Sequence, residues 1–496
     1  MLLPLALTAH FIFASTGEPP LRFGADAQGG APYIFQDPKN PNRVTGFEKE
    51  IADELARRMG RSAESVQAPW DKLLELVGRG DFDIALNGLE LADEKKRVAR
   101  LSRPYLAVAE RLTVRKADAR APRTLRDLRG RKVGTLPGSV AERLLTEAGA
   151  DVRTYDGGQD DVYRDLILGR TDAVLLDAPI ATYYALDASL ETLEESFGTV
   201  TYVAAVGPDN EALLTQVDAA LKAMTDDGYL RALYERWGLW TPEAAKALGV
   251  EFSKAKAAPT ELERWLESSG ALVSWQERVL HRYPSYLPLL ARGAAVTLAV
   301  SFCAMCLAVL LGLLLAVARS EGPTALRWAA TAYVEFFRGT PLLIQLTMVY
   351  FGLPQWGVRL DPFTAGVVAL GLNYAAAEAE NYRAGLSSVP RGQVEAAQVL
   401  GLSRAAILRH ITAPQAVRIA LPPMTNDFIA LLKDSSLVSL VTLTELSKSY
   451  SSLANATRDH LGLGAMAALI YLGLGLPFAV LARKAEAHFG RHLRRG

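Results

Sequence analysis

Cysteine is scarce and net charge is absent in this chain of 496 residues. The two cysteines, Cys303 and Cys306, stand three positions apart within an apolar run. Cysteines in such a run behave as small hydrophobic residues, so we predict neither a disulfide nor a metal site there. Lys+Arg and Asp+Glu each number 54, and this balance argues against nucleic acid or another polyanion as a partner.

A phosphate-binding loop is also missing from the sequence. No G-x-x-x-x-G-K-[ST] run occurs, and this is the pattern whose backbone N–H groups hold the phosphates of ATP. We therefore expect no cofactor in this chain. Any ATP that drives its activity must be bound by another subunit.

The composition indicates a chain of mixed character. Half of its residues are hydrophobic, yet 22% are charged, and the length leaves room for about three domains. We expect a soluble part followed by a membrane part. Residues 1–18 contain the apolar run LLPLALTAHFIFAS, which has the length of a signal peptide but no basic region before it. We interpret them as a weak signal peptide or leader, with a disordered leader or an N-terminal anchor as the alternatives.

Strands and helices alternate in the predicted soluble part, residues 19–240. Apolar or alternating segments at 21–26, 82–87, 132–135 and 171–176 predict strands. A helix follows Gly46, with Phe47, Ile51 and Leu55 on one face, and it stops at Gly60. This alternation predicts an α/β domain with largely parallel sheets.

Short motifs along this part match a known family in the family's order. They are Asp26 with Pro32-Tyr33, GF at 46–47, Trp70, GDFDIALNG at 80–88, DEKKR at 93–97, SRPY at 102–105, DLRGRKVG at 127–134, GRTDAVLLD at 169–177 and DGYLRALYERWG at 227–238. Together they resemble the extracellular solute-binding proteins (family 3) for polar amino acids. The resemblance implies a two-lobed, periplasmic-binding-protein-like α/β fold of type II. Lobe one would comprise residues 21–113 and 200–240, lobe two residues 114–199, with two crossing strands between them.

The resemblance also implies a ligand site. Asp177, at the carboxyl end of a predicted strand, matches the position that takes the ligand ammonium. Ser139 opens a predicted helix with a capping box, and a helix N-terminus suits a carboxylate. Gly88 matches a backbone position close to the ligand, Trp70 an aromatic clamp, and Asp26 a carboxylate at the edge of the pocket.

Two residues depart from the family pattern. Glu90 and Lys95 stand where the family usually has Thr and Arg, and Lys cannot grip a carboxylate with two parallel bonds as Arg does. Two roles are open for Glu90: it pairs with Lys95, or it favours a cationic ligand. The amino acid itself is therefore left open.

The second half predicts a membrane domain. Apolar runs at 287–317, 328–353, 363–382, 419–440 and 461–481 are long enough for about five spans within residues 287–485. A polar linker with an amphipathic helix at 241–286 precedes them, and residues 486–496 form a basic tail. Basic residues follow the first, third and last spans, which places residues 1–286 outside and the C-terminus in the cytoplasm.

A polar loop between the third and fourth spans carries the most specific motif. In EAAQVLGLSRAAILRHITAPQAVRIALPP, residues 395–423, one short helix is predicted to end at Gly401. Ser403 then caps a second helix that Pro414 is expected to end. The segment resembles the coupling loop of ABC-transporter permeases, here 391–415. The resemblance implies that Glu395, Ala396, Ala397 and Gly401 meet a cytoplasmic ATPase subunit.

Further residues fit the same membrane family. FRGTPLLIQL at 337–346 and KDSSL at 433–437 resemble the amino-acid importer branch of these permeases. Four ionisable residues fall within or beside predicted spans: Glu378, Glu380, Asp427 and Lys433, with polar Asn426 next to them. Such groups mark a pathway or a packed interface. Both roles stay open, as does a place at the cytoplasmic rim.

The sequence therefore predicts a fused solute-binding and permease subunit of an importer for a polar amino acid. We expect a homodimer in the cell membrane with a separate ATPase. One alternative is a ligand-gated channel of glutamate-receptor type, but that design inserts the pore within the binding domain. Another is an enzyme on the binding scaffold, although all six histidines lie outside the matched pocket motifs.

Overall fold

A computed structural model describes residues 18–28, 30–155, 158–268 and 273–489. The predicted leader, apart from its last residue, and most of the predicted basic tail lie outside the described residues. The chain divides into two compact units. One comprises the residues up to Ile34, Thr45–Val66 and Trp70–Glu263, and the other comprises Phe35–Val44, Gln67–Pro69 and the chain from Arg264 onward.

The first unit is built on one large sheet. Its strands are β1 (Leu21–Ala25), β4 (Ala63–Gln67), β5 (Ile84–Ala85), β6 (Arg100–Arg115), β7 (Lys132–Thr135), β8 (Asp151–Thr154), β9 (Ala173–Asp177), β10 (Leu190–Thr192) and β11 (Thr199–Val206). They follow the order β4-β1-β5-β11-β6-β9-β7-β8, with β10 on β6. A separate small sheet pairs β2 (Phe35–Gln36) with β3 (Val44–Thr45).

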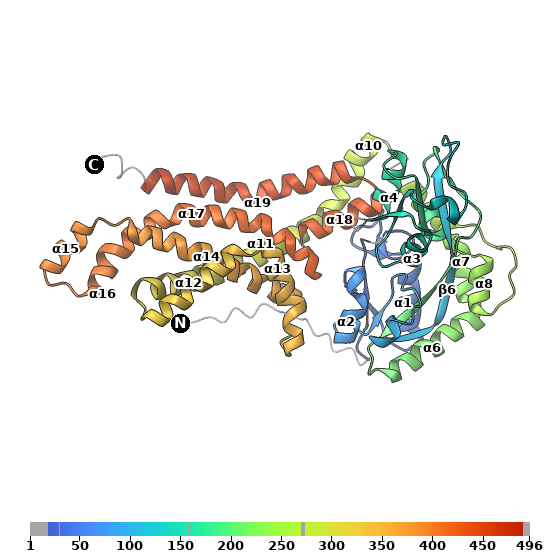
Figure 1. Cartoon of the computed structure of the whole chain (residues 1–496), viewed down its shortest axis with the longest axis horizontal. Helices are drawn as coiled ribbons and strands as arrows, with labels where there is room; N and C mark the ends of the chain where they lie inside the picture. The colour runs from blue at the N-terminus through green and yellow to red at the C-terminus, as the bar shows by residue number, and fades with distance from the viewer. Residues whose placement is uncertain (1–17, 29, 156–157, 269–272, 490–496) are drawn as a thin grey trace. The chain divides into compact units, whose positions relative to one another are not determined.

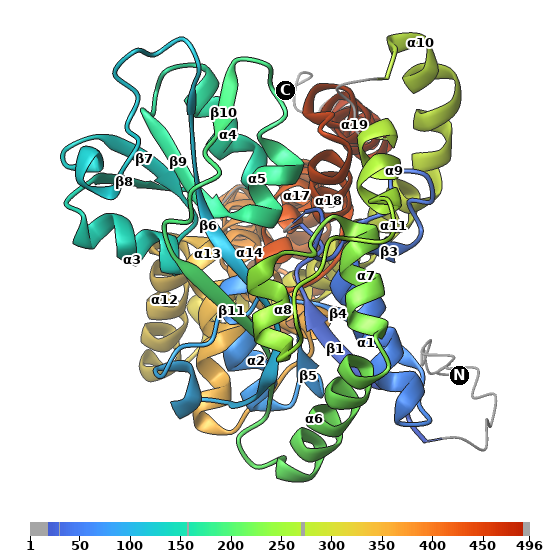
Figure 2. The ribbon, with the colours of Figure 1, turned by 90° about the vertical axis from the view of Figure 1, so that its right-hand side faces the viewer.

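Two long strands are shared by the two ends of this sheet. β6 and β11 pair antiparallel over most of their length, and β6 then continues to pair with β9 and β10 (Figure 2). At one end β1 and β5 run parallel, and at the other β7 runs parallel to both β8 and β9. The predicted arrangement of two α/β lobes joined by two crossing strands is confirmed.

Helices cover the strands of both lobes. They are α1 (Phe47–Arg58), α2 (Leu73–Arg79), α3 (Val140–Glu147), α4 (Gln159–Ile167), α5 (Ala178–Tyr184), α6 (Glu211–Asp226) and α7 (Tyr229–Trp237). The predicted apolar face of α1 is buried at Phe47, Ile51 and Leu55. In lobe two, Leu145 of α3 packs on Val133 of β7 and its neighbours. Burying these side chains is what fixes each helix on its sheet.

The predicted linker contains more helix than the sequence indicated. α8 (Pro242–Leu248), α9 (Thr260–Ser268) and α10 (Trp275–Glu277) all lie between residues 241 and 286. Only α9 corresponds to the predicted amphipathic helix. α8 begins with the Thr241 side chain accepting from the N–H of Ala244 and ends at left-handed Gly249, so local capping signals define it.

The second unit is largely helical. It contains α11 (Tyr283–Glu321), α12 (Thr324–Gly339), α13 (Leu342–Thr347), α14 (Pro362–Ser387), α15 (Arg391–Val399), α16 (Arg404–Ile407), α17 (Ala413–Asp434), α18 (Leu446–Thr457) and α19 (His460–Phe489). Each predicted span coincides with helix, and the second is broken between α12 and α13 at Thr340–Pro341. Two stretches in the described chain, Trp275–Ser320 and His460–Lys484, are long and apolar enough by themselves to cross a membrane.

Glycines allow the main helices of this unit to approach closely. A Cβ on Gly312 of α11 would lie 2.6 Å from Cβ of Glu378 on α14. A Cβ on Gly371 of α14 would lie 2.6 Å from the Leu307 side chain on α11. α11, α14, α17 and α19 run side by side in Figure 1, with α15 and α16 beyond one end of α14 and α17. Small residues at such crossings are typical of membrane bundles.

Polar side chains join the same helices. Arg319 of α11 pairs with Glu380 of α14. Asn381 of α14 donates to Asp427 of α17 at 2.7 Å. Tyr374 likewise joins α14 to Asp434 at 2.8 Å. Glu380 and Asp427 thus bridge helices, which is one of the roles left open for them by the sequence.

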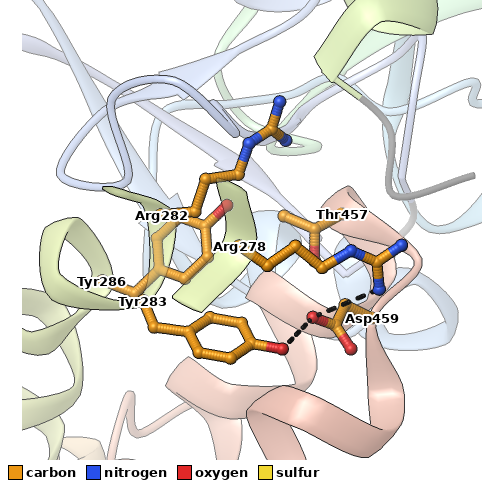
Figure 3. Close-up of a pocket in the computed structure, with 6 residues that line it drawn as sticks. All are labelled: Arg278, Arg282, Tyr283, Tyr286, Thr457 and Asp459. Atoms are coloured by element: carbon orange, nitrogen blue, oxygen red, sulfur yellow. Dashed lines mark hydrogen bonds and ion pairs between the residues drawn. The ribbon is translucent and has the colours of Figure 1, made fainter. Parts of the chain in front are cut away.

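A second polar cluster lies where α18 meets α19. Figure 3 shows Tyr283 and Arg278 pointing at Asp459. The Tyr283 hydroxyl donates to Asp459 at 2.8 Å, and an Arg278 guanidinium nitrogen lies 3.7 Å from the same oxygen. Asp459 also accepts from the N–H of Gly462 at 3.0 Å. The carboxylate therefore caps the start of α19 and anchors the start of α11 to it.

Pro414 does not end the helix that Ser403 begins, contrary to the sequence prediction. α16 passes into a π-helical turn, Leu408–Thr412, which leads directly into α17. In that turn the N–H of Ala413 bonds to the carbonyl of Leu408, five residues back. The wider turn accommodates a proline that an ordinary α-helix would resist.

Candidate functional site

Asp177 occupies the predicted position at the carboxyl end of β9. In the β9–β6 pairing it stands opposite Glu110. Two phenol groups donate to its carboxylate: Tyr33 at 3.0 Å, and Tyr202 of β11. These hydroxyls hold the carboxylate in one orientation at the point where the two crossing strands leave lobe two.

Glu90 lies beside this carboxylate, although it comes from lobe one. The segment around it pairs with β11, with Glu90 opposite Tyr202. Its side chain reaches the start of α3 in lobe two, where its oxygens accept from the N–H of Val140 at 3.0 and 3.1 Å. A helix N-terminus attracts anions. In this structure the protein's own Glu90 uses the donor that the sequence reading assigned to a ligand carboxylate.

Glu110 completes a group of three carboxylates. It is fully buried on β6, and its carboxyl group shares a side-chain hydrogen bond with Asp177. One oxygen each from Glu90, Glu110 and Asp177 lies within 4.8 Å of the others. We call these three residues the acidic triad. Three acidic groups so close together, largely removed from water, disfavour one another's ionised forms.

The pKa values of the acidic triad are all raised, and burial is the main cause. The pKa of Glu90 rises to about 7, with the Asp177 charge as the next cause and Lys95 opposing it. Burial and the charges of Asp177 and Glu90 raise the pKa of Glu110 well above its usual range. The pKa of Asp177 rises through burial, while the bonds from Tyr202 and Tyr33 lower it. A bound cation would favour the ionised forms of all three.

Lys95 lies beside Glu90 of the acidic triad, with Trp70 next to it. The Lys95 ammonium stands 5.7 Å from the centre of the Trp70 ring, a cation–π arrangement. Burial lowers the pKa of Lys95, and Glu90 raises it. The indole N–H of Trp70 donates to the Asn87 carbonyl at 2.8 Å, which fixes the ring. The role of Glu90 as the charge partner of Lys95 is thus compatible with its place in the acidic triad.

Gly88 has a left-handed backbone with φ +60°. A Cβ there would lie 3.1 Å from the Tyr33 ring, so the glycine allows the loop to pass close to this tyrosine. The N–H of Gly88 donates at 2.7 Å to Glu48, which also accepts from Tyr105 at 2.5 Å. Burial raises the pKa of Glu48 to about 7. This buried network holds the loop that contains Gly88 in place.

The other two predicted site residues have local structural roles. The Ser139 hydroxyl accepts from the N–H of Glu142 at 3.1 Å and donates to the Leu136 carbonyl at 2.7 Å. It is therefore the N-cap of α3, as predicted. The Asp26 carboxylate accepts from the N–H of Gln28 at 3.0 Å and closes a turn after β1. The ligand contacts expected of Ser139 and Asp26 remain predictions.

Three members of the site had no assigned role in the sequence reading: Tyr33, Tyr202 and Glu110. Tyr33 stands in a matched motif, but nothing local shows that its hydroxyl reaches Asp177, 144 residues away. A glutamate after the apolar run LAVA at 106–109, in a segment that reads as a strand, is the one signal that could have identified Glu110. Such a residue on a buried strand needs a partner or a purpose.

The predicted coupling loop forms a compact pair of helices. α15 ends at Val399, two residues before Gly401, which has φ +79°. The Ser403 side chain caps α16 by accepting from the N–H of Ala406. Glu395 and Ala396 are exposed, whereas Ala397 is buried within the pair. The tip is apolar and exposed, with Val399 at 87% and Leu400 at 79% exposure. Exposed apolar side chains of this size are typical of a surface that meets a partner.

Comparison with known proteins gives two family matches. Residues 21–239 match the bacterial extracellular solute-binding proteins, family 3. Residues 308–490 match the binding-protein-dependent transport system inner membrane component. The first match ends before the second begins. This order differs from a receptor channel, in which the pore interrupts the binding domain, and the glutamate-receptor alternative is therefore not supported.

Curated relatives that are amino-acid permeases match about two fifths of the chain. The probable amino-acid ABC transporter permease protein YckA of Bacillus subtilis (strain 168) is 37% identical over 205 residues, which are 41% of this chain and 91% of YckA. The probable glutamine ABC transporter permease protein GlnM of the same organism is 40% identical over 184 residues, or 37% and 85% of the two chains. A solved structure, described as an amino acid ABC transporter with histidines, is 36% identical with a TM-score of 0.41 and covers 44% of this chain and 99% of its own.

Proposed function

We propose that this chain captures a polar amino acid outside the cell and passes it inward as the permease of an ABC importer. The chain belongs to the binding-protein-dependent transport system inner membrane components, and it carries a solute-binding domain of family 3 in the same polypeptide. The succession of the two matches in one chain carries this proposal. A soluble receptor normally has to find its permease by diffusion. Here the two are tethered, so the captured solute stays at a high effective concentration near the permease.

The acidic triad and its neighbours supply the chemistry of capture. Asp177 offers a charge for the ligand ammonium, and Lys95 offers one for the ligand carboxylate. Trp70 supplies an apolar wall. Asp177→Ala removes a charge-assisted hydrogen bond worth about 1.5–3 kcal/mol, which corresponds to a loss of affinity of about ten- to a hundred-fold.

A separate ATPase subunit supplies the energy in this proposal. The exposed tip around Val399 and Leu400, with Glu395 and Ala396 beside it, offers a partner a small rigid surface at one end of the helical unit. About five spans are too few to enclose a pathway, and closed two-fold assemblies are the commonest oligomers. We therefore propose a homodimer that carries two external binding domains and two cytoplasmic ATPase subunits. The termini of the membrane domain would follow the positive-inside rule, with the C-terminus in the cytoplasm.

Calorimetry on the purified full-length chain tests the capture step. Titration with each of the common amino acids should give saturable heat with at least one polar amino acid, and Asp177→Ala should weaken it. Glu191→Ala, at an exposed carboxylate paired with Arg123 in the same lobe, is the control and should leave binding unchanged. If no amino acid gives heat with the unmodified chain, the proposal fails.

A further inference from the structure

Glu90 joins the two lobes of the binding domain through its carboxylate. The residue belongs to lobe one, where its segment pairs with β11 opposite Tyr202. Both of its oxygens accept from the N–H of Val140, the first residue of α3 in lobe two, at 3.0 and 3.1 Å. Glu90 is only 5% exposed. The hydrogen bond between the lobes therefore lies where water scarcely reaches it.

The surroundings of the Glu90 carboxylate are those that a ligand carboxylate needs. The N–H of Val140 stands at the positive end of the α3 dipole, which attracts anions. The charges of Lys95 and Arg143 favour the ionised form of Glu90. The Lys95 ammonium is buried and has no hydrogen-bond partner in the described chain. A ligand carboxylate that approaches Lys95 therefore finds Glu90 on the neighbouring donor, and two carboxylates on one N–H repel each other.

We propose that Glu90 is an internal mimic of the ligand carboxylate, which holds the lobes together through Val140 and must leave this donor when an amino acid binds. This inference rests on the proposed function. Displacing Glu90 breaks a charge-assisted hydrogen bond, so Glu90 lowers the affinity for every ligand that brings a carboxylate to α3. A cation without a carboxylate leaves Glu90 in place and can use its charge. Glu90 thus determines which class of ligand the site holds most tightly.

A double-mutant cycle on the full-length chain in lipid nanodiscs tests this competition. Calorimetry at about pH 8, where Glu90 with its pKa of about 7 is largely ionised, titrates L-glutamine, L-lysine and each other common amino acid that binds. Glu90→Ala frees the donor and should tighten binding about tenfold. Val140→Pro removes the N–H, yet proline suits the first position of a helix after the extended Ser139. In that background Glu90→Ala should change affinity by less than about threefold, because no shared donor remains.

Two further variants separate the hydrogen bond from the charge. Glu94→Ala removes another carboxylate that acts on Lys95, and it should leave affinity within about threefold of the unmodified chain. Glu90→Gln keeps an acceptor for the N–H of Val140 but loses the charge. Its gain in affinity should therefore be smaller than that of Glu90→Ala.

Each outcome separates the inference from its premise. If no amino acid binds the unmodified chain, the proposed function fails. If amino acids bind but Glu90→Ala does not tighten their binding, only the inference is overturned. An equal gain with and without the N–H of Val140 also overturns it, because Glu90 then acts by charge repulsion alone. Should circular dichroism show that Val140→Pro does not fold, Glu90→Gln against Glu90→Ala decides, and equal gains overturn the inference.

Discussion

The turn between α15 and α16 offers a sharp test of coupling. Gly401 has φ +79°, a left-handed backbone that glycine adopts freely and L-residues resist. No atom lies within 4 Å of where its Cβ would stand. A side chain at this position therefore meets open space, and its effect must come from the backbone alone. Gly401→Val places a β-branched residue in this left-handed backbone conformation, which β-branched residues adopt least readily.

The expected size of the effect follows from that geometry. The left-handed conformation costs an L-residue about 1–2 kcal/mol, which shifts the population of the native turn by roughly 5–30-fold. Gly392 is a matched control, because its Cβ position is equally open and its backbone has no positive φ. Gly401→Asn is a rescue variant, since asparagine tolerates the left-handed region better than other residues.

The assay measures three activities in liposomes that contain the chain with its ATPase. Gly401→Val should lower solute uptake per ATP hydrolysed by about the factor given above, while solute binding stays intact. Gly392→Val should resemble the unmodified chain, and Gly401→Asn should recover most of the uptake. Full uptake by Gly401→Val, or loss of solute binding together with uptake, would refute the reasoning that this turn aims a coupling element.

Three further predictions concern single side chains. Burial raises the pKa of Glu90 from 4.5 to about 7. A cationic ligand that needs ionised Glu90 should therefore bind more tightly as pH rises from about 5 to 7, by at most about tenfold per pH unit, and its affinity should then level off. Glu90→Gln should flatten this rise in calorimetry. Tyr202→Phe removes a donor to Asp177 and should weaken ligand binding by about three- to tenfold, with unchanged far-UV circular dichroism. Asp459→Asn removes the negative charge beside Arg278 and Tyr283, so thermal unfolding in detergent should show a loss of about 1–3 kcal/mol, and an unchanged melting temperature would contradict this.

Much of the fold could be predicted because its signals are local. β7 occupies the predicted residues 132–135, and α1 carries the predicted buried face. Gly401 and Ser403 mark the end of one helix and the start of the next, since a left-handed glycine and a capping hydroxyl each act within one turn. The predicted membrane spans coincide with helices for a similar reason, because length and hydropathy are properties of one segment.

The failures have physical causes that a local pattern does not contain. Pro414 was expected to end a helix, but the preceding π-helical turn depends on hydrogen bonds one residue out of the usual register. α18 is short and moderately polar, and its start is fixed by Glu445, which accepts from Thr297 of α11 and Tyr471 of α19 at 3.2 and 2.9 Å. Residues distant in sequence thus stabilise this helix, which hydropathy alone does not predict.

The site itself shows why strand register matters more than motif. Glu110 meets Asp177 because the β6–β9 pairing sets these two residues opposite each other, and Glu90 meets Tyr202 because its segment pairs with β11. A slip of one residue would turn Glu110 to the other face of the sheet and separate the acidic triad. The three carboxylates also come from both lobes and a strand common to both. A change to any of the three carboxylates therefore acts where the two lobes meet, so we expect ligand affinity and lobe closure to change together in the variants of the triad.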